Sequence, residues 1–294
     1  MKQKMGIACV LAAGILWGIL GIFVREFNAE GLQSLQITFI RVTFSSLCLI
    51  VGLFLYDRKL LKIQLRDCWC FIGTGIIGFT FFNYCYFTTM QYTSLSIAAV
   101  LLYTAPVFVM TFSIFLFKEQ LTKHKIAAFV LAFGGCTCSV GLFGSEHAIS
   151  WQGILLGLGS GLGYGLVTVF TRYALQRGYH SLTIVLYTMI FASIGTAVAA
   201  DIGPVFQVLA AEPLLIPHGF LFAVLCTILP NLFYTLGLER LENGKASIIA
   251  SIEPIAATVT GVIAFHELFD IWGALGIALM IAALIVLNRN QGQL

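Results

Sequence analysis

Apolar residues along this chain fall into long blocks that are separated by short polar stretches. Most blocks reach 18 residues or more, and about 20 apolar residues in a helix cross a bilayer core of about 30 Å. The pattern therefore predicts membrane-spanning helices rather than the shorter, alternating strands of a membrane barrel. The ten predicted spans lie at about 5–24, 34–56, 69–90, 94–117, 124–142, 153–175, 182–200, 216–238, 244–265 and 271–288.

Two of these blocks are copies of one another. The stretch 98–119 is repeated 148 positions later as 246–267, and each copy has a proline near its middle and a glutamate at its end. Because proline weakens a helix locally, we expect Pro106 and Pro254, together with Pro230, to mark hinges. The strongest matches are Pro106 with Pro254, Phe117 with Phe265, and Glu119 with Glu267.

The repeat extends over both halves of the chain. Since each copy would hold an odd number of spans, five, the second copy must sit upside down relative to the first. Inverted repeats of this kind are a transporter architecture with the substrate site near the middle of the bilayer. We therefore expect an all-α integral membrane protein, with residues 1–145 and 146–294 as inverted five-helix repeats around a central cavity. Further matches are Asn83 with Asn231, Tyr86 with Tyr234, Trp17 with Tyr164, and Arg25 with Arg172.

Composition and charge agree with a membrane protein. The 294 residues are 59% hydrophobic and only 10% charged, against about 25% charged residues in soluble domains. Of the 16 Lys and Arg residues, all but Arg25 and Arg41 fall in segments on one side of the predicted spans. The positive-inside rule then places both termini in the cytoplasm of a multi-pass protein of the cell (inner) membrane. The net charge of +3 is thus a topology signal and predicts no nucleic-acid partner.

Several short motifs together resemble a known family. They are the Trp17–Gly18 pair, FIRVTF around Arg41, the helix ends FKEQL and FHELF, and Glu253–Pro254. With ten spans in two halves, the chain resembles the drug/metabolite transporter superfamily, EamA type. That resemblance implies secondary transport of small metabolites, commonly export, through a cavity between spans 1, 3, 4, 6, 8 and 9. The first half departs from the second in one respect, because Ala105 stands where the second half has Glu253.

Two charged residues lie deep within predicted spans. Glu253 is about 14 Å from the inner start of its span at 1.5 Å per residue, and an acid at that depth is a functional candidate by default. It could exchange a proton, bind an amino group, or accept hydrogen bonds from backbone loosened by Pro254. Arg41, about 10 Å below the outer face, could snorkel outward or pair with Glu253. We expect such a pair to open during transport.

Amide and aromatic residues complete the predicted substrate site. An amide in an apolar helix should face the protein interior, and polar groups among aromatic rings are typical of small-molecule sites. Each aromatic residue taken singly is equally compatible with helix packing. In a straight helix Ser251 and Glu253 would face different sides, a conflict that the kink at Pro254 leaves open. The predicted substrate-binding residues are Trp17, Asn83, Tyr86, Phe87, Tyr103, Tyr164, Asn231, Tyr234, Ser251 and Glu253.

These features predict a secondary transporter that works by alternating access and exports amino acids or related compounds. Nucleobase, nucleotide or vitamin-type solutes are the alternative, and an intramembrane enzyme or a receptor is the alternative of another class. No HExxH motif and no paired intramembrane aspartates support catalysis, no phosphate-binding GxxxxGK[ST] loop supports a pump, and no cofactor or metal site is predicted. The sequence leaves open protons or another ion as coupling partners, and a monomer or a homodimer.

Overall fold

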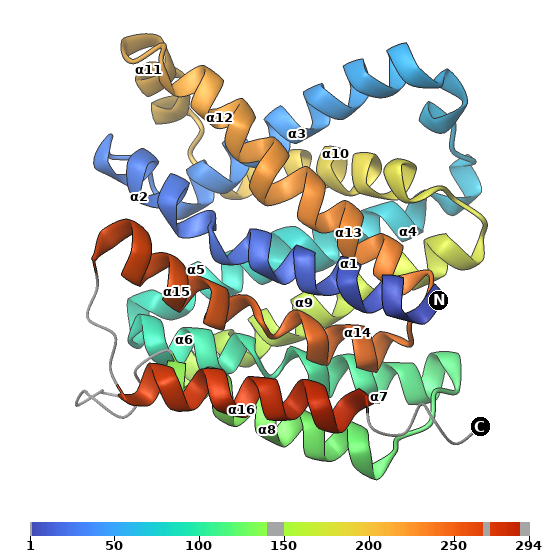
Figure 1. The fold of residues 1–294 in the computed structure, drawn as a ribbon. Coiled ribbons are helices and arrows are strands. Elements are labelled where there is room, and N and C mark those ends of the chain that lie inside the picture. Colours follow the sequence, from blue (N-terminus) through green and yellow to red (C-terminus); the bar gives the residue numbers. More distant parts are fainter. Residues whose placement is uncertain (1, 140–149, 267–270, 289–294) are drawn as a thin grey trace.

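The computed structural model describes residues 2–139, 150–266 and 271–288, and these residues form helices without any strand (Figure 1). Eight helical segments within them are long and apolar enough to cross a membrane, which confirms the predicted all-α membrane class. The other two predicted spans correspond to α8 (Lys123–Ser139) and α16 (Ile271–Asn288), with 17 and 18 residues. These two helices pack side by side along one edge of the bundle (Figure 1).

The first half of the chain contains five predicted spans, and three of them are built from helices joined end to end. Ser94 begins one of them as an N-cap, because its side chain accepts the backbone N–H of Ile97 at 3.2 Å. The elements are α1 (Lys2–Gly18), α2 (Leu20–Ala29), α3 (Ser34–Tyr56), η1 (Arg58–Leu61), η2 (Leu65–Asp67), α4 (Cys68–Ile72), η3 (Gly73–Thr80), α5 (Phe81–Tyr92), α6 (Leu95–Leu102), α7 (Ala105–Phe117) and α8.

The second half follows the same order after a long, uninterrupted first helix. Ser150 caps that helix by accepting the backbone N–H of Gly153 at 3.3 Å. The polar connector before residue 215 contains a short helix of its own. The elements are α9 (Trp151–Gln176), α10 (Ser181–Ala199), α11 (Gly203–Ala211), α12 (Leu215–Ala223), η5 (Val224–Ile228), α13 (Leu229–Leu238), α14 (Asn243–Ala250), α15 (Glu253–Phe265) and α16.

The repeated spans break just before their prolines. α6 ends before Tyr103–Thr104 and α14 ends before Ser251–Ile252, positions that match one another after a shift of 148. Pro106 and Pro254 then stand in the first turns of α7 and α15, where a missing backbone N–H costs no helical hydrogen bond. The prolines therefore begin a second helix instead of kinking a continuous one.

Spans 3 and 8 share an irregularity that periodicity did not predict. In both, the helix widens into π-helical turns, over Gly73–Thr80 in η3 and Val224–Ile228 in η5. Shifted by 148 positions, η5 coincides with the last five residues of η3. Pro230 follows η5 in the first turn of α13. Such widened turns occur often at functional sites, and here they precede the helices that carry Asn83 and Asn231.

Glycines let the two halves approach closely. A Cβ atom placed on Gly14 would lie 2.3 Å from Ile252, and one on Gly18 would lie 2.4 Å from Ala256. The equivalent contacts in the other half are those of Gly161 with Thr104 and Gly165 with Phe108. α1 thus packs against α14 and α15, as α9 packs against α6 and α7. Helix packing explains these small residues, as is usual in membranes.

Candidate functional site

A central cavity lies between helices of both halves. About 530 Å³ of space not occupied by atoms, open solvent included, lies between its lining residues. Six of the residues predicted from the sequence line it: Trp17, Arg41, Tyr164, Asn231, Tyr234 and Glu253. The structure therefore brings together residues from α1, α3, α9, α13 and α15.

Aromatic side chains form the walls of this cavity and hold one another in place. The indole of Trp17 lies 6.3 Å from the ring of Tyr164, edge to face, and 5.6 Å from the ring of Tyr234. Phe82 meets Tyr164 edge to face at 5.6 Å. The hydroxyl groups of Tyr234 and Thr168 are hydrogen-bonded at 2.8 Å. This arrangement presents an apolar surface with a fixed polar edge.

Arg41 is held in its orientation by Asn83, the residue that matches Asn231 in the repeat. Its guanidinium donates a hydrogen bond to Oδ1 of Asn83 at 3.3 Å and lies 5.1 Å from the ring of Phe79. Asn83 is 2% exposed, and its Nδ2 donates to the carbonyl of Phe79 at 2.8 Å. Asn83 therefore holds the guanidinium of Arg41 in place, and Asn83 is not itself among the residues that line the cavity.

Glu253 opens α15 and faces the cavity without a partner of its own. Its side chain is partly exposed, and within the described part of the chain no hydrogen bond or ion pair reaches its carboxylate. In particular, Arg41 and Glu253 line the same cavity but are not joined in this structure. The cavity therefore presents one acid and one base separately.

A second, smaller cavity adjoins the first. About 270 Å³ of space not occupied by atoms, open solvent included, lies between its lining residues, and Tyr164 and Glu253 line both cavities. Ser251 lines it together with Glu253 because the helix breaks at Ser251–Ile252. Because of this break, Ser251 and Glu253 line the same cavity, which a straight helix would not allow. Tyr103 and Pro106 also line this cavity, because span 4 breaks at the matching position.

Not every predicted residue lies at these cavities. Tyr86 and Phe87, whose rings lie 5.5 Å apart on α5, are not among the residues that line either one. Pro230 and Pro254 are buried in first turns. Sequence reasoning in turn missed five residues that line the central cavity: Leu20, Phe79, Phe82, Val167 and Thr168. Spacing could have found Thr168, which follows Tyr164 by four positions and so lies on the same helix face.

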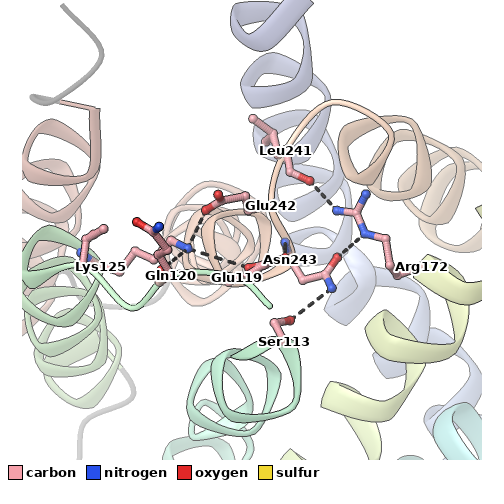
Figure 2. A network of polar contacts seen from close by, with 10 residues as sticks. Ser113, Glu119, Gln120, Lys125, Arg172, Leu241, Glu242 and Asn243 are labelled. Carbon is pink, nitrogen blue, oxygen red and sulfur yellow. Dashed lines mark hydrogen bonds and ion pairs between the residues drawn. The ribbon is translucent and has the colours of Figure 1, made fainter. Parts of the chain in front are cut away.

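A polar network joins the two halves at the end of the bundle where α1 begins, and Figure 2 shows its members. The carboxylate of Glu119 accepts the backbone N–H groups of Asn243 and Gly244, at 2.7 and 3.2 Å. These are the first two residues of α14, so Glu119 caps a helix of the other half. Glu267, its predicted counterpart, lies outside the described residues.

Two basic side chains complete this network. Lys125 contacts Glu119 at 3.7 Å and Glu242 at 2.5 Å. Arg172 donates to Oδ1 of Asn243 at 2.6 Å and also to the carbonyl of Leu241, as drawn in Figure 2. The network therefore ties α9 and the end of α7 to the link between α13 and α14.

The sequence and the fold both resemble those of other proteins. The model of the EamA-like transporter family matches residues 4–141 and again residues 151–289. The chain is 26% identical to an uncharacterized transporter of Archaeoglobus fulgidus over 98% of both chains. It is 22% identical to the uncharacterized transporter YetK of Bacillus subtilis, over 97% of this chain and 88% of YetK. A crystal structure with 15% identity superposes with a TM-score of 0.80 over 98% of this chain and 97% of that one.

Proposed function

Because this chain belongs to the EamA-like transporter family, we propose that it is a secondary transporter that moves a small metabolite by alternating access. The observation that carries the proposal is the central cavity, which is lined by aromatic side chains and by Arg41 and Glu253, two charged residues that are not paired with each other. A charge held away from water is costly in a membrane and is retained where it serves a substrate or an ion.

Contacts between helices support two inverted halves, residues 1–145 and 146–294. Span 1 packs on spans 8 and 9, and span 6 packs on spans 3 and 4. Spans 2 and 7, spans 4 and 9, and spans 5 and 10 pack on each other. Exchanging the halves leaves this set of contacts unchanged, as a two-fold axis requires. With five spans in each half, that axis lies in the plane of the membrane.

Charge supports the orientation of the bundle. The excess of Lys and Arg on the side of the N-terminus supports a cytoplasmic N-terminus. The network of Glu119, Lys125 and Arg172 then joins the halves on the cytoplasmic side of the cavity. Alternating access requires this side to open while the other closes, so the network is the part that must break for the cavity to reach the cytoplasm.

Amino acids or related compounds are the substrate class that the cavity fits best, and export is the direction we propose. An amino acid carries a carboxylate and an ammonium group, which match Arg41 and Glu253 respectively. The aromatic walls then receive an apolar side chain. The same walls also favour a planar ring, because rings stack edge to face on Trp17, Tyr164 and Tyr234. Nucleobase-type and vitamin-type solutes are therefore the second candidate.

The test is transport by the purified protein in liposomes. Labelled amino acids, nucleobases and vitamins are offered as a panel, with and without a pH gradient. We expect saturable flux of amino acids that is lost in Arg41→Gln and in Glu253→Gln, and unchanged in Glu30→Gln, which alters an exposed acid at the end of α2. Flux confined to ring solutes would favour the second candidate. Absence of flux for the whole panel, or full activity in both variants, would refute the proposal.

A further inference from the structure

A third pocket lies at the end of the bundle where α1 begins, apart from the central cavity. It contains about 770 Å³, open solvent included, and shares no lining residue with the other two cavities. Gln3 of α1, the start of α8, the link between α13 and α14, and Leu287 of α16 surround it. The pocket is therefore formed between helices at the edge of the bundle.

Lys245 is the unusual member of its lining. The residue is only 6% exposed, and its Nζ has no hydrogen-bond partner in the described structure. Burying an ammonium group without a partner is strongly unfavourable. A buried lysine that lines a pocket and lacks an acceptor indicates that an acceptor binds there.

The carboxylates nearby are already engaged by other cations. Glu242 lies 2.5 Å from Nζ of Lys125, and Glu239 lies 3.3 Å from the guanidinium of Arg240. Both Lys125 and Arg240 line the pocket with Lys245, whereas Glu242 is the one acidic lining residue within the described part of the chain. The lining thus has an excess of positive charge, and Lys245 is the group that remains to be neutralised.

We propose that this pocket binds a phosphate-type anion, with an anion oxygen accepting a hydrogen bond from Nζ of Lys245 and with Lys125 and Arg240 adding attraction. The phosphate of an anionic lipid and free inorganic phosphate share this chemistry. Basic pockets between helices on the cytoplasmic side of a membrane are suited to lipid headgroups. That the anion belongs to a lipid headgroup rests on the proposed orientation of the protein in the membrane. Anion binding itself does not depend on transport activity.

The experiment measures the thermal unfolding midpoint of the purified full-length protein in detergent at fixed ionic strength. The probes are dioleoylphosphatidylglycerol, zwitterionic dioleoylphosphatidylcholine, and inorganic phosphate. We expect phosphatidylglycerol, or phosphate, to raise the midpoint more than phosphatidylcholine does. A response to phosphatidylglycerol alone identifies a headgroup site, and a response to phosphate as well identifies a site for the free anion.

Two variants and one control assign the site. Lys245→Met should raise the half-saturating concentration about tenfold or more, the cost of losing one hydrogen bond to a charged group. Lys245→Arg keeps the charge and should keep the response. Lys123→Gln, which removes an exposed lysine just outside the lining, should behave as the unmodified chain. Equal shifts with both lipids and none with phosphate, or an unchanged response in Lys245→Met, would overturn the proposal.

Discussion

Replacing Glu119 by glutamine tests whether the network of Figure 2 holds the proposed cytoplasmic side closed. The substitution keeps the size of the side chain and removes its charge. Glu119 is 11% exposed and accepts two backbone N–H groups, at 2.7 and 3.2 Å, besides its 3.7 Å contact with Lys125. The amide oxygen of glutamine can still accept hydrogen bonds, so the substitution weakens the network without leaving a cavity at this position.

The expected loss follows from the strength of the bonds. Hydrogen bonds to a charged group are roughly twice as strong as neutral ones, a difference of about 1 kcal/mol each. Two such bonds give about 2 kcal/mol, which corresponds to about a 30-fold change in a conformational equilibrium. If these bonds exist only in the closed state, Glu119→Gln raises the population of the open state by that factor.

Hydrogen exchange followed by mass spectrometry reads this population at the first turn of α14. The amides of Asn243 and Gly244 should exchange about 30-fold faster in Glu119→Gln than in the unmodified protein. Glu242→Gln is the matched control, because Glu242 pairs with the same lysine but is 56% exposed, and exposed pairs contribute only about 0–1 kcal/mol. Equal exchange in all three proteins would refute the idea that Glu119 holds the two halves together.

Three further substitutions test the packing and the cavity. Gly18→Leu should lower stability by about 1–3 kcal/mol, seen as a lower thermal midpoint, because its Cβ would lie 2.4 Å from α15; Gly21→Leu, with nothing within 4 Å of its Cβ position, should not. Thr168→Val removes the hydrogen bond to Tyr234 and should weaken substrate affinity about fivefold in the liposome assay, together with a lower thermal midpoint because the buried Tyr234 hydroxyl loses its partner. Asp67→Asn weakens buried polar contacts at the end of α9 and should reduce stability by about 1–2 kcal/mol; an unchanged midpoint would show that those contacts are dispensable.

Much of the fold could be predicted because long apolar segments in a membrane have few alternatives to a helix. The matched prolines Pro106 and Pro254 lie just after the breaks in spans 4 and 9. Their breaks came earlier than expected, at Tyr103–Thr104 and Ser251–Ile252, since proline is tolerated in a first helical turn. The loosened carbonyl of Ser251 accepts a hydrogen bond from the thiol of Cys136 at 3.6 Å, a contact between distant segments that no local pattern reveals.

The candidate site was predicted less completely than the fold. Trp17 and Tyr234 reach the cavity because they lie on helices that face the other half. Tyr86 and Phe87 do not line it, although Tyr86 matches Tyr234 in the repeat and π-helical turns precede both residues. The partner of Glu119 was also unpredictable, because it comes from the opposite half of the chain.

The most direct test of the central claim places one cysteine in the cavity and asks from which side it can be reached. Leu20→Cys suits this purpose, because Leu20 lines the cavity without taking part in its polar contacts. A membrane-impermeant thiol reagent is applied from either side of the bilayer, and modification of that peptide is quantified by mass spectrometry against the unmodified chain. Alternating access predicts modification from both sides, with substrate shifting the balance between them. Modification from one side only, whether or not substrate is present, would contradict it.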